Sequence, residues 1–426
     1  MKTYKNKFYS GRRSFLKTSL VAGISVFCSP LSAIQIEPNK VKYNLSLDNP
    51  YSFFDGKSCF VHLRGAIVPG SENNWTPRVV MTMSLLDLSG SDVFKATYGM
   101  ETNDLGKTWT NPKKLDNLAP LYENNNGEKH PVALCDFWPK WNKNSKILLG
   151  TGNTADYTPQ WKAPLPRSRH TSYALYNSEE GTWSDWQKMK MPDYKKFYNC
   201  GAGSAQRYDK EDGTILLPVY FLPDPLVTNY SVTVIRCSLH DKKLEYRDHG
   251  DEISIDANGT RGLFEPSITF FKEEYFLTIR NDKNGFVARS QDGLHFSPVE
   301  RWKFDDGSDL GSYNTQQHWV THSDGLFLVY TRKGANNDNV FRNRAPLFMA
   351  QVDPVKLCVV RETEQILAPN RGARLGNFGV TDVSPNETWV TISEWMQPKG
   401  VEKYGSDGRL WVSRIHWSKP NQLFDV

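Results

Sequence analysis

The sequence predicts an all-β protein, folded as a β-propeller of six blades. Three observations support this fold: the composition, an apolar strand that recurs along the chain, and a turn motif that recurs between strands. The 426 residues include 30 Gly, 24 Pro and 13% aromatic residues, and no long amphipathic apolar run is present. Such a composition is typical of many short strands joined by tight turns.

One apolar strand recurs six times, each copy following a turn and ending on a polar residue. The copies are residues 78–84, 145–151, 213–220, 274–280, 325–332 and 387–394. Their spacing of roughly 50 to 70 residues leaves room for one four-stranded sheet per copy. Six copies predict six blades, and residues 41–60 are the candidate source of part of a seventh. Continuous apolar runs suit inner strands, so we expect the polar ends near the axis: Tyr220, Arg280, Arg332 and Glu394.

A turn motif supports the blades. Residues Thr102 to Trp109 read Thr-x-Asp-x-Gly-x-x-Trp, residues 290–296 form a shortened copy, and residues 178–183 form a faint third. In such a turn the Asp accepts backbone N–H groups, the Gly takes a positive φ, and the Trp packs between sheets. The motif resembles the Asp-box of sialidase-like propellers. The resemblance implies a structural hairpin closure at the outer edge of a blade, far from the active site.

The first 33 residues have the pattern of an export signal. Arg12 and Arg13 are followed by Phe15-Leu16-Lys17, then by an apolar stretch to residue 27 and small residues to residue 33. The segment resembles a twin-arginine signal peptide. We therefore expect a signal peptide at 1–33 and a single propeller domain at 34–426. The mature protein is expected to be periplasmic or secreted, without stable membrane insertion.

Charge and cysteine content narrow the partners. The net charge is +5, and no block of basic residues follows the N-terminal segment, so nucleic acid is not expected as a partner. An anionic oligosaccharide or polysaccharide fits this charge. Five cysteines follow the signal in an odd count and without metal-ligand spacing: Cys59, Cys135, Cys200, Cys237 and Cys358. We expect buried thiols rather than a disulfide scaffold, and neither a metal nor a cofactor.

Arginine-bearing segments supply candidate ligands for an anionic sugar. The segments are His62-Leu63-Arg64, Glu265-Pro266-Ser267 followed by Arg280, and Arg342-Asn343-Arg344. They resemble the three segments that give sialidase-like enzymes their carboxylate-binding arginines, and the resemblance covers most of the chain after about residue 55. It implies substrate binding by Arg64, Glu265, Arg280 and Arg344, with Arg207 and Arg332 as further candidates. Arg64 also suits an inter-blade ion pair, and Glu265 a turn cap.

The resemblance fails at one point. A sialidase needs a tyrosine nucleophile in its last blade, activated by a glutamate, and residues 372–382 contain no tyrosine. Sialic acid release is therefore not the expected reaction.

Histidines in polar segments form a second candidate set. Its members are His130, His170, Tyr198 and His318, and Trp319 offers an aromatic platform for a sugar ring. In residue type and order they resemble the active sites of propeller polysaccharide lyases, such as ulvan and rhamnosyl-glucuronate lyases, and of a related ulvan oligosaccharide dehydratase. The resemblance implies β-elimination across C4–C5 of a uronic acid, with these four residues as acids and bases.

Two alternatives to elimination stay open. The first is an exo-glycosidase of an anionic sugar that uses Glu265 or Asp382 with a water molecule, which requires two carboxyl groups beside the bond. The second is a propeller that binds glycans through Trp319 without catalysis. Each histidine taken singly suits a structural role as well as a catalytic one.

Overall fold

The computed structural model describes residues 40–70, 76–90, 92–125, 127–164, 167–192, 195–222 and 226–425. The signal peptide predicted at 1–33 lies outside these residues. Residues Asn39–Val426 form one compact unit. Within the described ranges, no helix has the length and apolarity needed to span a membrane.

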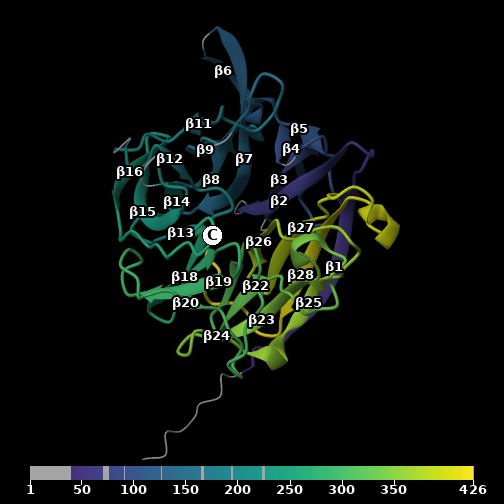
Figure 1. The fold of residues 1–426 in the computed structure, drawn as a ribbon. Helices are drawn as coiled ribbons and strands as arrows, with labels where there is room; N and C mark the ends of the chain where they lie inside the picture. Colours follow the sequence, from purple (N-terminus) through teal and green to yellow (C-terminus); the bar gives the residue numbers. More distant parts are fainter. Residues whose placement is uncertain are drawn as a thin grey trace, which may run out of the picture. The chain divides into compact units, whose positions relative to one another are not determined.

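Six antiparallel sheets surround a central axis and form the blades of a propeller (Figure 1). Blade 1 contains β2 (Ser58–Val68), β3 (Arg78–Asp87), β4 (Val93–Thr102) and β5 (Lys113–Lys114). Blade 2 contains β6 (Leu121–Asn125), β7 (Glu128–Asn142), β8 (Ile147–Asp156), β9 (Thr171–Asn177), β10 (Thr182–Trp183) and β11 (Gln187–Lys188). Blade 3 contains β12 (Asn199–Gly201), β13 (Tyr208–Asp209), β14 (Ile215–Leu222), β15 (Ser231–His240) and β16 (Lys243–His249).

The second half of the chain forms the other three blades. Blade 4 contains β17 (Phe264–Phe271), β18 (Glu274–Arg280), β19 (Gly285–Ser290) and β20 (Glu300–Arg301). Blade 5 contains β21 (His318–His322), β22 (Gly325–Tyr330), β23 (Leu347–Asp353), β24 (Cys358–Val359) and β25 (Gln365–Ala368). Blade 6 contains β26 (Phe378–Ser384), β27 (Glu387–Ser393), β28 (Arg409–Trp417) and β1 (Tyr43–Ser52). Four short 3₁₀ turns connect strands: η1 (Asp116–Leu118), η2 (Phe341–Asn343), η3 (Arg361–Thr363) and η4 (Val401–Tyr404).

The N-terminal strand closes the ring. β1 pairs with β28, so an early segment completes the last blade, and the two lie side by side in Figure 1. The prediction of six blades is confirmed for the described part of the chain. Residues 41–60 supply the outer strand of blade 6 and the start of β2 rather than a seventh blade.

The recurrent apolar strands are the second strands of the blades, not the innermost ones. They correspond to β3, β8, β14, β18, β22 and β27, each paired on both sides within its own sheet. A strand that is paired on both sides and covered on both faces is apolar throughout, whereas a strand that lines the axis must carry polar groups. The prediction was therefore correct about one copy per blade and wrong about its position.

The Asp-box turns close the hairpins between the third and fourth strands. Between β4 and β5, the Asp104 carboxylate accepts the N–H of Thr108 at 2.9 Å, and Gly106 has a φ of 78°. The Asp292 turn joins β19 to β20 in the same way, and the turn before Trp183 joins β9 to β10. The structural role predicted for these turns is confirmed.

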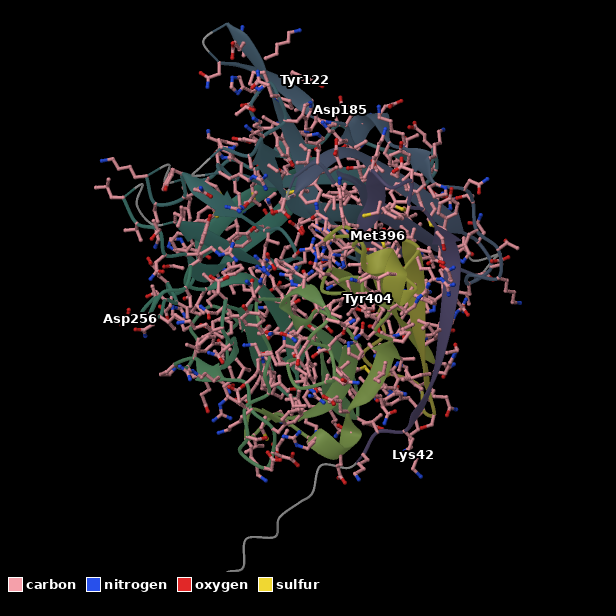
Figure 2. The ribbon with its side chains drawn as sticks, turned by 45° about the vertical axis from the view of Figure 1, so that its right-hand side comes forward. Lys42, Tyr122, Asp185, Asp256, Met396 and Tyr404 are labelled. Atoms are coloured by element: carbon pink, nitrogen blue, oxygen red, sulfur yellow. The ribbon has the colours of Figure 1, made fainter. Side chains whose placement is uncertain are left out.

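Two further features complete the fold. The five described cysteines are free thiols and all are buried, as expected. The hairpin of β6 and β7 projects from blade 2 and carries the exposed side chain of Tyr122 (Figure 2).

Candidate functional site

A ring of polar residues in left-handed backbone conformation surrounds one end of the axis. Its members come from the innermost strands, or the segments beside them, of five successive blades: His62 (φ 57°), Asp136 (51°), Ser204 (53°), Glu265 (48°) and Asn314 (46°). In blades 1, 2 and 4 this residue lies in a β-bulge, which redirects a side chain out of the strand ladder. Such a conformation costs on the order of 1–3 kcal/mol for a non-glycine residue and is concentrated at functional sites.

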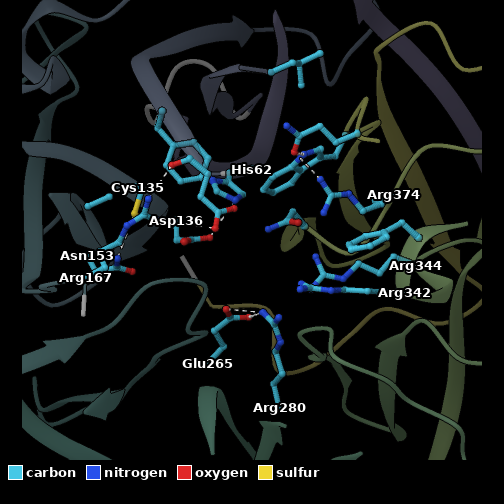
Figure 3. Close-up of a pocket in the computed structure, with 18 of the residues that line it drawn as sticks. His62, Cys135, Asp136, Asn153, Arg167, Glu265, Arg280, Arg342, Arg344 and Arg374 are labelled. Atoms are coloured by element: carbon cyan, nitrogen blue, oxygen red, sulfur yellow. Dashed lines mark hydrogen bonds and ion pairs between the residues drawn. The ribbon is translucent and has the colours of Figure 1, made fainter. Parts of the chain in front are cut away.

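A pocket of about 450 Å³ lies at this ring (Figure 3). Its described lining contains eight basic side chains and three carboxyl groups. The basic ones are Arg167, Arg169, Arg261, Arg280, Arg342, Arg344, Arg374 and Lys399, and the acidic ones are Asp92, Asp136 and Glu265. An excess of positive charge in a concave site attracts anionic ligands.

Asp136 is held by two neighbours in the ring. Its Oδ1 lies 3.1 Å from Nε2 of His62 and accepts a 2.6 Å hydrogen bond from the Ser204 hydroxyl, while its side chain stays 18% exposed. Burial raises the pKa of Asp136, but His62, Ser204, Arg64 and Arg280 outweigh that effect and bring the pKa below its usual value. Asp136 is therefore an ionised carboxylate that faces the pocket in a fixed orientation.

His62 is the neutral partner of Asp136. Burial lowers the pKa of its imidazole more than Asp136 raises it. Because an ionised carboxylate can only accept, Nε2 of His62 carries the proton and Nδ1 keeps its lone pair. Nδ1 is buried without a hydrogen-bond partner among the described residues, and the ring packs against Phe94 and Trp395.

Glu265 positions Arg280. Both Glu265 oxygens accept from Nη1 of Arg280, at 2.6 and 2.5 Å, and Nη2 of Arg280 donates to Oδ1 of Asn314 at 2.6 Å. Both residues line the pocket. Because both oxygens of Glu265 pair with Arg280, the carboxylate neutralises the charge of that arginine.

Three arginines of blades 5 and 6 form a wall without a carboxylate partner. No described carboxylate lies within ion-pair distance of Arg342, Arg344 or Arg374, which lie together on one side of Figure 3. Arg344 donates through Nε to the Asn314 carbonyl at 3.0 Å, and Arg374 donates to Gln397 at 2.9 Å and stacks on Trp395. We call this set the arginine wall.

The arginine wall carries more positive charge than the nearby carboxylates offset. Burial and repulsion from Arg280, Arg374 and Arg342 bring the pKa of Arg344 well below its usual value. Burial and the same kind of repulsion act on Arg342, and burial lowers the pKa of Arg374 to about 10. Buried charges without partners are unfavourable, so this wall suits a bound anion.

Other predicted binding residues lie elsewhere. Arg64 is fully buried beneath the ring, where it donates to Ser204 and Gln316 at 3.2 Å and stacks on Trp138. It does not line the pocket. Arg332 is ion-paired with Glu364 at 2.6 Å, away from the pocket.

Arg207, Trp319 and Asp382 line a second cavity of about 710 Å³. β2 contributes His62 to the first pocket and Ile67 to this cavity, so the two lie at opposite ends of the inner strands, about 16 Å apart along β2. Trp319 is fully buried and donates to the Ser267 carbonyl, so its proposed role as an exposed sugar platform is wrong. Its ring packs in the hydrophobic core against Phe276 and Trp302.

The structure does not bring His130, His170, Tyr198 and His318 to the pocket. His130 lies 3.2 Å from the Tyr157 carbonyl, and His170 lies 3.2 Å from the Ser168 hydroxyl. His318 is fully buried between Trp138 and Phe378, with its ring nitrogens near Ser267 and Gln316. Tyr198 is half-buried outside the pocket lining.

Several ionisable residues of the pocket were not among the predicted site residues: His62, Asp92, Asp136, Arg167, Arg169, Arg261, Arg342, Arg374 and Lys399. Two of them carried a usable signal, because His62 and Asp136 each interrupt an apolar run, at 59–63 and 132–138. A polar residue inside such a run breaks strand alternation and indicates a bulge. Asp92 and Arg374 lie in connections between strands, and nothing in the local pattern distinguishes them.

Comparisons with known proteins support the fold. No protein-family model matches the chain, and no curated protein matches it by sequence. Among solved structures, it is similar to a protein of unknown function from Dyadobacter fermentans, with a TM-score of 0.60, 13% identity, and coverage of 88% of this chain and 99% of that one.

It is also similar to the Trypanosoma rangeli sialidase, with a TM-score of 0.53, 12% identity and coverage of 83% of this chain, although it spans only 55% of that protein. A leech intramolecular trans-sialidase gives a TM-score of 0.55 at 10% identity, with coverage of 87% of this chain and 70% of that one. The chain therefore has the fold of a sialidase-like six-bladed propeller.

Proposed function

We propose that this protein is a carbohydrate-active enzyme that hydrolyses a glycoside of an anionic sugar. The observation that carries the proposal is the arginine wall, whose uncompensated charges face the same pocket as the ionised Asp136. Planar guanidinium groups bind a carboxylate through paired hydrogen bonds. The solved relatives include sialidases, which supports a glycan as substrate.

The hydrolytic step would use two carboxyl groups of the pocket. Asp136 would take a proton from water while the water oxygen bonds to the anomeric carbon and the glycosidic C–O bond breaks. Asp92, whose side chain is 46% exposed and lies 3.9 Å from Arg167, would take up a proton from solvent and pass it to the leaving oxygen. This inverting scheme requires no tyrosine nucleophile, in agreement with the absence of tyrosine from residues 372–382.

Elimination at a uronic acid is the second candidate. The dyad of Asp136 and neutral His62 favours it, because a proton acceptor would then lie in the same pocket as arginines that neutralise the sugar carboxylate. The acceptor would take the C5 proton, the C4–O bond would break as a C4=C5 double bond forms, and the departing oxygen would take up a proton. The leaving group would be a sugar in a lyase and water in a dehydratase.

Incubation with defined anionic oligosaccharides, followed by mass spectrometry, tests the proposal. Hydrolysis adds one water across the cleaved bond, a lyase cleaves without adding water, and a dehydratase removes one water from an intact chain. We expect hydrolysis products from the wild-type protein and none from Asp136→Asn. Binding without any product after long incubation would show a non-catalytic glycan-binding propeller instead.

We also propose that the protein acts outside the cytoplasm. Support comes from the Arg12-Arg13 pair and the apolar stretch that follows it. Fractionation of cells that produce the full chain, with Arg12→Lys and Arg13→Lys exchanged together as the control, tests this proposal.

A further inference from the structure

A second set of cations lies across the pocket from the arginine wall. Arg167 and Arg169 come from the segment between β8 and β9, and Figure 3 shows Arg167 on the opposite side of the pocket from Arg342, Arg344 and Arg374. The pair of Glu265 and Arg280 lies between the two sides. We call Arg167 and Arg169 the opposite pair.

The opposite pair lacks a close carboxylate partner. The guanidinium of Arg169 lies 5.8 and 5.5 Å from the ring centres of Tyr220 and Tyr230 and donates to the Tyr230 hydroxyl. No described carboxylate lies within ion-pair distance of it. Arg167 lies 3.9 Å from Asp92, at the limit of an ion pair, and its Nε is buried without a partner.

A single carboxylate cannot neutralise both sides of this pocket. Glu265 pairs with Arg280, and no described ion pair joins Asp136 to Arg167 or Arg169, so the pocket lining holds more cations than carboxylates. A carboxylate bound at the arginine wall would add one negative charge there and leave Arg169 without an anion. The two tyrosine rings hold the Arg169 fork in place, which reduces the entropy lost when it binds a ligand.

We propose that the ligand of this pocket carries two anionic groups. A carboxylate binds the arginine wall, and a second anionic group, either a sulfate ester or a second carboxylate, binds Arg169 and Arg167. This inference rests on the proposed function, because it assumes that the pocket binds an anionic glycan. It adds the substrate class, a doubly anionic sugar or disaccharide.

Calorimetric titration of the mature chain with three probes tests the inference. The probes are a disaccharide with one uronic acid, the same disaccharide with a sulfate ester, and a disaccharide with two uronic acids. A charge-assisted hydrogen bond contributes about 1.5–3 kcal/mol, so we expect at least one doubly anionic probe to bind about 10- to 100-fold more tightly than the singly anionic one. The sulfated and diuronic probes show which second group fits.

Arginine variants separate the two sides of the pocket. Arg169→Gln should abolish the preference for the second anionic group, so that the three probes bind with similar affinity. Arg342→Gln should weaken binding of all three probes. Arg236→Gln is the matched control, because it removes an exposed arginine of β15 that pairs with Asp248. It should change neither the preference for a second anionic group nor the affinity for any probe.

Two results would overturn the inference: equal affinity of the wild type for all three probes, or an equal loss for all three in Arg169→Gln. If Arg169→Gln does not fold, Arg169→Lys must reduce the preference several-fold, because lysine lacks the planar fork. Failure of the proposed function gives a different result, in which the wild type neither binds nor converts any of the probes.

Discussion

Arginines at the two ends of the propeller axis are held in different ways. At the far end, Arg207 donates to Asp209 and to the carbonyls of Leu149 and Lys140, so its guanidinium is paired and well bonded. At the pocket end, Arg342 makes no ion pair or hydrogen bond with the described residues and stacks on Phe341. Both arginines lie near the axis. The partners of a side chain, rather than its position, distinguish a structural arginine from one that is available to a ligand.

Carboxyl groups show the same contrast. Asp382 in the far cavity accepts a hydrogen bond from Thr388, and burial raises its pKa more than Thr388 and Lys140 lower it. Asp136 in the pocket has a lowered pKa and is ionised. Of these two carboxyl groups, only Asp136 has a pKa below its usual value.

The largest expected effect is on turnover. Asp136→Asn should lower turnover of an anionic glycoside by about 10²- to 10⁴-fold, because the amide cannot accept a proton. Asp382→Asn is the matched control and should leave turnover unchanged. Steady-state kinetics with circular dichroism of both variants checks this. Equal losses in the two variants would mean that the two ends do not differ in function.

The second effect is on stability. Arg207→Met should lower the free energy of unfolding by about 3–5 kcal/mol, since Asp209 would stay buried without its partner. Arg344→Met should lower the free energy of unfolding by much less, because it also removes the repulsion between Arg344 and its neighbours Arg280, Arg374 and Arg342. Urea unfolding measures both. A similar cost at the two positions would make the arginine wall a structural feature.

The sequence predicted the blades better than the site, for a physical reason. The six apolar strands and the Asp-box turns are local patterns set by burial and turn geometry, so they could be recognised one at a time. Glu265, Arg280 and Arg344 were found because they lie in recognisable segments. Asp136 and Arg374 become site residues only when distant blades meet, and the pairing that makes Arg207 structural depends on Asp209 and on the carbonyls of Leu149 and Lys140.

The third prediction concerns pH and tests whether His62 is neutral. Burial lowers the pKa of His62 and of His318 in the folded chain, while in the unfolded chain both return to about 6.5. Below that pH the unfolded chain binds protons that the folded chain does not, so stability falls as the pH falls. The expected slope is up to about 1.4 kcal/mol per pH unit for each histidine.

Urea unfolding between pH 7.5 and 5 measures this slope. His62→Gln and His318→Gln should each reduce it, and His240→Gln, which changes an exposed histidine of blade 3, should not. An unchanged slope in His62→Gln would mean that the pKa of His62 is the same in the folded and unfolded chains, and a steeper slope would mean that His62 is protonated when folded. Either result would contradict a neutral His62.

The smallest effect is expected at the outer edge, where the Asp-box turns lie. Gly106 has a φ of 78°, and a Cβ there would lie 2.5 Å from Nη2 of Arg414 and 3.2 Å from Trp389. Gly106→Ala should therefore cost about 1 kcal/mol or more of stability, through backbone strain and displacement of the Arg414 side chain. Gly213→Ala, at a φ of 85° with no atom within 4 Å of the added Cβ, isolates the backbone strain and should cost less stability.

Neither variant should change turnover at temperatures where it is folded, because both turns lie away from the pocket lining. A loss of turnover in Gly106→Ala without a loss of stability would connect the blade edge to the pocket, and the separation between structural edge and functional end would then be wrong.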